Sequence, residues 1–370
     1  APGPLAGLDA DAQRAWVMEF LAGRAGHHLE MDRNALPLGV PLRDLGFDSL
    51  TGLALRRDIE ERLALRPPAE LLLEGPSIEQ LTRALLRELT PEQATATPVV
   101  TASPGAWFTH VVRRPRPSLR LFCFPYGGGG ASLYRDWARL PANIEVWPVQ
   151  SPGRETRIHE PPIHQLDALL PQLESALLPH LDLPFAFYGH SLGALLAYLL
   201  ASRLRARGLP QPQHLVVGGF SAPFLAPGPY LDGLQRRFRE AGFDGVPAPG
   251  TREPLQPLLD IALATAEGRM MAGRDTDFAR ALLPMMLADL KLMEGYRYQP
   301  EPPFAFPITV MHGASDDRVT QEASEAWRAL TLGAFQKHVT PGDHFFLRAE
   351  QAQDWLLKRI AAALEPRASD

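Results

Sequence analysis

Residues 184–204 read PFAFYGHSLGALLAYLLASRL, and this stretch decides the fold of most of the chain. It opens with an apolar, strand-like run and ends with apolar residues at helical spacing. Between the two lies Gly-His-Ser-Leu-Gly at 189–193, a GxSxG pattern that places a serine hydroxyl at the N-terminus of a helix, in a tight turn permitted by the glycines. We therefore predict that Ser191 is a nucleophile; the alternative is a serine in an ordinary strand-to-helix turn.

Short apolar runs alternate with helical stretches on both sides of this segment. The strand-like runs are 119–124, 144–149, 185–188, 215–217, 308–311 and 335–339. Most gaps between them leave room for crossover helices, which predicts an α/β fold with a mostly parallel, doubly wound sheet. The gap from Ser221 to Phe306 is too long for a simple crossover and has no strand pattern. We predict that it forms a helical lid, about 222–300, over the carboxyl edge of the sheet.

The first ninety residues follow a different pattern. Apolar residues recur at helical spacing over 12–21, over 50–63 and after a capping box at Ser77 and Gln80, with no strand pattern between them. This predicts a small all-α bundle over 1–90. Residues 91–105, rich in Pro, Thr and Ala, are typical of a linker, so the second domain would be 106–370.

Composition excludes several classes of function. The 370 residues carry a formal net charge of -5, with no basic stripe interleaved with aromatics, so no nucleic-acid partner is expected. Cys123 is the single cysteine, which excludes an intrachain disulfide, and no metal site is predicted. No targeting pattern or membrane-spanning apolar stretch is present, and we expect a cytoplasmic protein with no membrane partner.

A serine hydroxyl needs a base within hydrogen-bond reach and a carboxylate that orients this base. Asp316 and Asp317 follow the fifth strand-like run and His344 follows the sixth, so both loops end at the edge of the sheet that carries Ser191. We predict Asp316 as the acid, with Asp317 as its competitor, and His344 as the base. The competing histidines are interpreted as structural residues: His190, His312 and His338.

The oxyanion of a tetrahedral intermediate needs two backbone N–H donors. Leu192, directly after the nucleophile, is predicted to supply one. The second is predicted from Gly127 in the glycine run 127–130, because glycine lets the backbone approach a ligand closely. This run does not fit a nucleotide-binding motif: no GK[ST] follows it, and a GxGxxG frame begun at Gly127 ends on Ser132.

Several stretches together resemble the thioesterases of nonribosomal peptide and polyketide assembly lines, particularly the type II, editing group. They are CFPYGGGGASLYRDWARLP (123–141), VQSPGRE (149–155), GHSLGALLAY (189–198), LPMMLADLKLMEGYRY (283–298), the Asp316 turn and GDHFFL (342–347). The resemblance runs from about Trp107 to the C-terminus and implies an α/β-hydrolase fold. Many integrated releasing thioesterases have their acid at the end of the strand that follows the helix after the GxSxG turn, the nucleophile elbow. Here Gly219-Phe220-Ser221 stands there, without Asp, which supports Asp316.

Two positions depart from the editing group. Gly127 stands where alanine is common, and Ser151 stands where leucine is commoner. Either difference would change the shape of the pocket, but neither removes a catalytic group.

The sequence Leu-Gly-Phe-Asp-Ser-Leu at 45–50 resembles acyl and peptidyl carrier domains. The resemblance implies that Ser49 carries covalent 4'-phosphopantetheine, loaded by a phosphopantetheinyl transferase, and that upstream synthase modules supply an acyl or peptidyl substrate. A plain helix cap is the alternative for Ser49. Because the chain begins at Ala1, we expect a piece of a larger synthase.

The two resemblances imply a carrier domain joined to a thioesterase that removes the carrier's acyl chain by hydrolysis or cyclisation. Tethering raises the local concentration of the carrier, to about millimolar for a short flexible linker. Three alternatives remain: an editing hydrolase that clears misprimed carriers, a free-standing lipase or esterase, and a non-catalytic docking module. A lipase would leave the carrier unexplained, whereas an intact Ser, Asp and His argue against a docking module.

Overall fold

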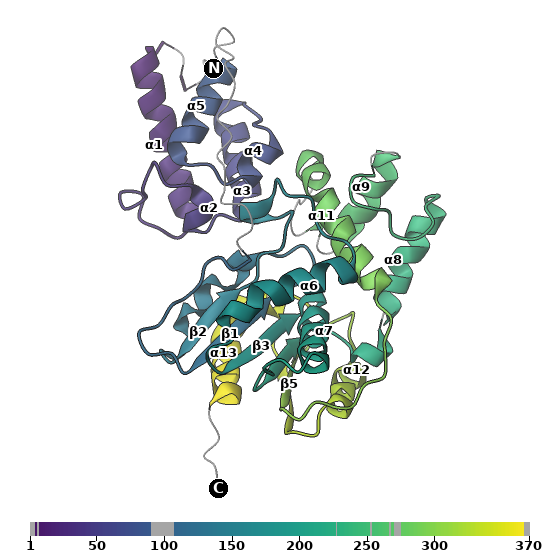
Figure 1. The fold of residues 1–370 in the computed structure, drawn as a ribbon. Helices are drawn as coiled ribbons and strands as arrows, with labels where there is room; N and C mark the ends of the chain where they lie inside the picture. Colours follow the sequence, from purple (N-terminus) through teal and green to yellow (C-terminus); the bar gives the residue numbers. More distant parts are fainter. Residues whose placement is uncertain are drawn as a thin grey trace. The chain divides into compact units, whose positions relative to one another are not determined.

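The computed structural model describes residues 4, 5, 7–89, 107–226, 228–251, 254–265, 268–269 and 275–365 (Figure 1). Contacts divide the chain into two compact units. Unit 1 comprises Ala1–Gly105, Pro152–Pro161 and Pro254–Pro284, and unit 2 comprises Ala106–Ser151, Pro162–Glu253 and Met285–Asp370. The predicted linker, 91–105, lies outside the described residues, and the domain boundaries at 90 and 106 stay a prediction.

The N-terminal part of unit 1 is built from helices. They are α1 (Ala10–His28), α2 (Leu42–Leu45), α3 (Ser49–Leu63), α4 (Ala69–Leu73) and α5 (Ile78–Leu89). The three predicted helices are present, and Ser77 and Gln80 exchange the two hydrogen bonds of the predicted capping box. The sequence pattern does not predict the short helices α2 and α4, because four or five residues are too few to show a helical period.

Unit 2 contains a six-stranded parallel sheet with strand order β2-β1-β3-β4-β5-β6. The strands are β1 (Leu119–Phe124), β2 (Ile144–Pro148), β3 (Phe185–His190), β4 (Leu215–Gly218), β5 (Ile308–Gly313) and β6 (Phe335–Thr340). Strands β1 to β5 are buried along their whole length, whereas β6, at the edge, is partly exposed. This agrees with their mostly apolar sequence, which is typical of strands covered on both faces. The charged exceptions, Arg120 in β1 and Glu145 in β2, pair with each other at 3.0 Å. The predicted parallel sheet is confirmed.

The order of the strands reverses between β1 and β3. The chain passes from β1 outward to β2, and then returns to place β3 on the other side of β1. The pairing register sets Phe124 beside Gly189, so the loop after β1 and the turn after β3 emerge next to each other. In open parallel sheets, such a reversal point at the carboxyl edge is where ligands bind.

Helices connect the strands and fill the long gap before β5. The connecting and C-terminal helices are α6 (Leu166–Leu177), α7 (Leu192–Ala206), α12 (Gln321–Glu325) and α13 (Glu350–Leu364). In the described part of the predicted lid, about 222–300, the structure has helices α8 (Gly228–Glu240), α9 (Leu255–Ala264) and α11 (Thr276–Gly295) and no strand; the lid itself stays a prediction. None of the described helices is both long enough and apolar enough to cross a membrane.

Candidate active site

Ser191 lies in a strained turn between β3 and α7. Its backbone has φ 52° and ψ -121°, which non-glycine residues rarely adopt. A Cβ atom at Gly189 would lie 2.3 Å from the carbonyl oxygen of Gly193, and one at Gly193 would lie 2.1 Å from that of Phe124. Only glycine fits at both positions, and the resulting turn leaves Ser191 partly exposed at the N-terminus of α7.

The structure brings Ser191, His344 and Asp316 together from three separate loops. The Nε2 atom of His344 lies 3.1 Å from Oγ of Ser191, and its Nδ1 atom lies 3.1 Å and 3.2 Å from the two carboxylate oxygens of Asp316. When Nδ1 carries the proton and donates to Asp316, Nε2 is left to accept the proton of the Ser191 hydroxyl. This arrangement allows His344 to act as a general base towards Ser191.

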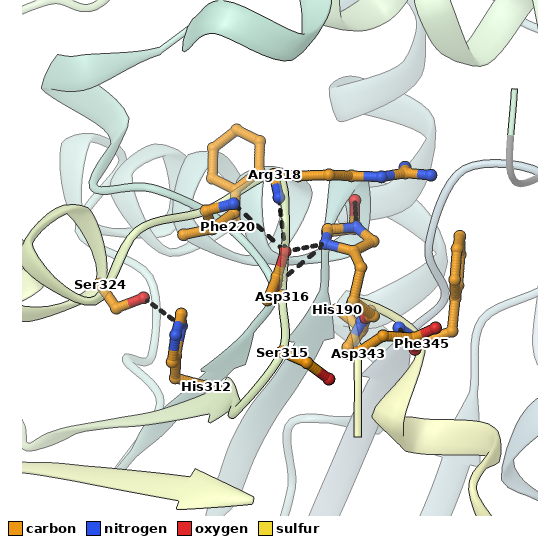
Figure 2. A network of polar contacts seen from close by, with 12 residues as sticks. His190, Phe220, His312, Ser315, Asp316, Arg318, Ser324, Asp343 and Phe345 are labelled. Carbon is orange, nitrogen blue, oxygen red and sulfur yellow. Dashed lines mark hydrogen bonds and ion pairs between the residues drawn. The ribbon is translucent and has the colours of Figure 1, made fainter. Parts of the chain in front are cut away.

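The Asp316 carboxylate accepts hydrogen bonds from within the turn after β5 (Figure 2). Its Oδ1 atom accepts hydrogen bonds from the backbone N–H groups of Arg318 at 2.9 Å and Val319 at 3.2 Å. Burial acts to raise the pKa of Asp316, but the hydrogen bond and charge of His344, together with these N–H groups, outweigh it and lower the pKa below its usual value. Asp317 is exposed, and the contact with His344 is made by Asp316.

The other histidines have structural contacts, as interpreted from the sequence. His312 pairs its Nδ1 atom with the Ser324 hydroxyl at 2.9 Å, a pair that Figure 2 shows apart from Asp316. His338 packs against Trp355. His190 is fully buried, and its Nε2 atom lies 2.7 Å from the carbonyl oxygen of His344, to which it donates. It therefore helps to hold the His344 loop, a role that the sequence does not indicate.

The glycine loop after β1 is held by a buried carboxylate that sequence reasoning missed. The N–H of Gly128 donates to Oδ2 of Asp289 at 2.7 Å, and Asp289, on α11, is only 2% exposed. Gly127 and Leu192, the predicted oxyanion donors, lie in this loop and at the first position of α7. The sequence signal that could have found Asp289 is a carboxylate among apolar residues of one helix, since such a residue is seldom buried unless it is paired.

Ser49 is the first residue of α3 and is partly exposed. Asp48 caps this helix, and its carboxylate accepts hydrogen bonds from the N–H groups of Leu50 and Thr51. These two N–H groups are therefore not available to a phosphate, whereas the dipole of the helix still favours an anion here. An accessible hydroxyl at the start of a helix still fits covalent attachment of a phosphodiester.

Comparison with known families matches both parts of the chain. The family described as "Thioesterase domain" matches residues 119–364, and the family described as "Phosphopantetheine attachment site" matches residues 19–85. The first match covers the sheet and all three residues of the Ser191 site. The second covers α3 with Ser49.

Individual relatives agree with these families. The chain is 37% identical over 272 residues to linear gramicidin dehydrogenase LgrE of Brevibacillus parabrevis, covering 71% of this chain and 94% of that protein. It is 33% identical over 270 residues to the gramicidin S biosynthesis protein GrsT of Aneurinibacillus migulanus, covering 70% and 96%. Among solved structures, RedJ, a thioesterase of the prodiginine pathway in Streptomyces coelicolor, aligns with a TM-score of 0.53 at 34% identity, covering 75% of this chain and 99% of RedJ. The chain therefore belongs to the thioesterase domain family, has its α/β-hydrolase fold, and carries an N-terminal domain of the phosphopantetheine-attachment family.

Proposed function

We propose that Ser191, His344 and Asp316 form the catalytic triad with which this thioesterase cleaves an acyl thioester held on Ser49. The observation that carries the proposal is the continuous path of contacts from Oγ of Ser191 through both nitrogens of His344 to the Asp316 carboxylate, each about 3.1 Å. The serine contacts the histidine and the histidine contacts the aspartate, as serine hydrolases require, although the three residues lie more than 25 positions apart in the sequence.

In the first half-reaction, Oγ of Ser191 attacks the carbonyl carbon of the thioester while its proton passes to Nε2 of His344. The negative charge that develops on the carbonyl oxygen is stabilised by the N–H groups of Leu192 and Gly127. When the tetrahedral intermediate collapses, the C–S bond breaks and the leaving sulfur takes the proton from His344. Asp316 stays ionised throughout and stabilises the imidazolium, consistent with its lowered pKa.

In the second half-reaction, the acyl ester on Ser191 is attacked by a nucleophile activated by His344. Water yields a free acid, whereas a hydroxyl or amine of the acyl chain yields a ring. The leaving Oγ of Ser191 recovers the proton from His344, which restores the starting state. The nature of the product is thus set by which nucleophile reaches the ester.

Ser49 is the residue that we propose to hold 4'-phosphopantetheine, installed by a phosphopantetheinyl transferase. The attached group would supply a terminal thiol that carries the acyl chain as a thioester. The chain's own contribution is a partly exposed serine at the start of α3, which Asp48 caps. We infer that upstream synthase modules deliver the acyl or peptidyl group.

A second candidate function is editing of misprimed carriers. The support is the alignment with BorB, a type II thioesterase from the borrelidin cluster, at a TM-score of 0.52 and 29% identity. Release of a finished product requires selectivity for one long chain. Editing requires broad activity towards short acyl groups, so a panel of acyl lengths separates the two.

The test loads Ser49 with acyl-pantetheine, using a phosphopantetheinyl transferase, and follows the intact mass of the full chain over time. The parent should lose the acyl mass at least about 100-fold faster than Ser191→Ala, and Ser49→Ala should gain no mass at all. The mass of the released product distinguishes acid from ring. Equal retention by the parent and Ser191→Ala across the whole panel would refute the proposed function, and loading of Ser49→Ala would refute the attachment site.

A further inference from the structure

Asp289 connects helix α11 with the loop that follows β1. Its side chain is buried, and Oδ2 accepts the Gly128 N–H at 2.7 Å. Further along the same helix, Glu294 holds a second loop, because it accepts the N–H of Val246 at 2.9 Å. Its other carboxylate oxygen accepts from Lys291 of the same helix at 2.8 Å. Helix α11 thus presents two acidic residues that hold different loops.

The glycine loop needs such support. Residues 127–130 have no side chains, so no packing of their own fixes their backbone, and Gly128 adopts φ 84°. Within the loop, the Gly129 N–H donates to the carbonyl of Tyr126 at 2.9 Å and closes a turn. The Asp289 bond is a tertiary contact that fixes the peptide between Gly127 and Gly128.

We propose that Asp289 is a positioning residue that keeps the Gly127 N–H directed at the oxyanion. This inference rests on the proposed function. The Gly127 N–H belongs to the planar peptide between Tyr126 and Gly127, whose carbonyl oxygen accepts the Gly129 N–H. The Asp289 bond holds the next planar peptide, between Gly127 and Gly128, so Gly127 is fixed from both sides. Preorganised donors stabilise a transition state because they do not have to reorient while charge develops.

The negative charge of Asp289 does not itself help to stabilise the oxyanion. A Cβ atom at Gly127 would lie 3.7 Å from Cβ and 3.9 Å from Oδ2 of Asp289, so the carboxylate is close to the loop where negative charge develops. An anion there opposes an oxyanion. The benefit must come from the position of the accepting oxygen, and a neutral amide oxygen in the same place should serve as well.

The test compares Asp289→Asn, Asp289→Leu and Asp289→Glu in the full chain, with a small soluble acyl thioester as substrate. Asp289→Leu removes the acceptor and should lower kcat about 100-fold while KM stays within about threefold. Asp289→Asn keeps an acceptor and should stay within about fivefold of the parent. Asp289→Glu keeps the charge but displaces the oxygen, and should lose about tenfold in kcat.

Glu294→Gln is the matched control on the same helix, since its contacts lie away from the glycine loop, and it should keep the parent kcat. Inhibition by an alkyl boronic acid, which forms a tetrahedral anion on Ser191, should weaken in Asp289→Leu in proportion to kcat/KM. Circular dichroism and thermal unfolding show which variants fold. If Asp289→Leu does not fold, the other two variants test the proposal, because kcat of Asp289→Asn should exceed kcat of Asp289→Glu.

Three outcomes would each overturn the role of Asp289. They are a parent-like kcat in a folded Asp289→Leu, a loss of kcat in Glu294→Gln equal to that in Asp289→Leu, and equal kcat values in Asp289→Glu and Asp289→Asn. Inactive Ser191→Ala beside active Asp289→Leu would overturn this inference alone. Ser191→Ala with parent activity would instead overturn the proposed function.

Discussion

Two adjacent aspartates on the turn after β5 have opposite environments. The side chain of Asp316 is 0% exposed and contacts His344, whereas Asp317 is exposed to solvent. The turn itself separates them, because the Asp316 carboxylate accepts the N–H groups that follow it and is held facing inward. Neighbouring residues with the same side chain therefore have different chemistry.

Replacing each aspartate by asparagine separates these roles. Asp316→Asn should lower kcat by about 10³ to 10⁴-fold, because an amide stabilises neither the required tautomer nor the imidazolium of His344. Asp317→Asn should stay within about twofold of the parent. Steady-state hydrolysis of a soluble acyl thioester measures both, and a larger loss in Asp317→Asn would show that the acid is misassigned.

Gly127 is not required to be glycine by its backbone. It is absent from the glycines with positive φ, and an added Cβ would meet its nearest neighbour, Asp289, at 3.7 Å, an ordinary contact. Gly127→Ala should keep kcat within about threefold and raise the free energy of unfolding by about 0.4–1 kcal/mol, because alanine restricts the unfolded chain.

Gly128→Ala is the matched control for this change. Gly128 has φ 84°, so alanine should cost about 1–2 kcal/mol there and displace the loop. Urea unfolding together with kinetics gives both quantities. Equal effects of the two alanines would contradict this account of the loop.

At the scale of elements, β3 and α7 pack against the end of β1 through backbone atoms. A Cβ atom added at Gly193 would lie 2.1 Å from the Phe124 carbonyl oxygen, so there is no room for a side chain between the helix and the strand. The Tyr134 hydroxyl donates to the same carbonyl at 2.7 Å and fixes it further. The position of the elbow thus depends on close approach of three elements.

Gly193→Ala should destabilise the thioesterase by about 2–3 kcal/mol and lower kcat, because β1 and α7 must separate. Gly233→Ala, in α8, is the control: an added Cβ there meets nothing within 4 Å, so alanine should stabilise the helix by about 0.5–1 kcal/mol. Thermal and urea unfolding compare the two. A Gly193→Ala variant as stable as the parent would show that the elements can separate without cost.

At the scale of the whole molecule, the reversal between β1 and β3 gathers the site. Residues 127, 191, 316 and 344 follow β1, β3, β5 and β6, and parallel strands bring these loops to one edge. His190 is enclosed beneath them. Its pKa is lowered to about 3, first by burial and then by the charge of His344.

Global stability should therefore depend on pH through His190. Between its ordinary value of 6.5 and about 3, the unfolded chain binds a proton at this histidine and the folded chain does not. The free energy of unfolding should thus fall as pH is lowered from 6.5, by about 1.4 kcal/mol per pH unit from this group. Urea unfolding at pH 7, 6 and 5 should show that the free energy of unfolding depends less steeply on pH in His190→Gln than in the parent. The same pH dependence in both proteins would contradict the lowered pKa of His190.

The sequence by itself determined the six strands, the parallel sheet and the elbow serine, because continuous apolar runs and the GxSxG pattern are local signals that do not depend on distant residues. Asp316 and His344 each follow a strand-like run, so the sequence also placed them at the edge that carries Ser191, because parallel strands end at one edge. Only the tertiary structure showed that Asp316, and not Asp317, contacts His344, that Asp48 occupies the N–H groups beside Ser49, and that His190 and Asp289 hold loops of the site. The bonds of these last two residues join positions 154 and 161 residues apart. Such contacts arise from packing between elements. A carboxylate among the apolar residues of one helix can point to Asp289, but no local pattern names the distant residue that it contacts.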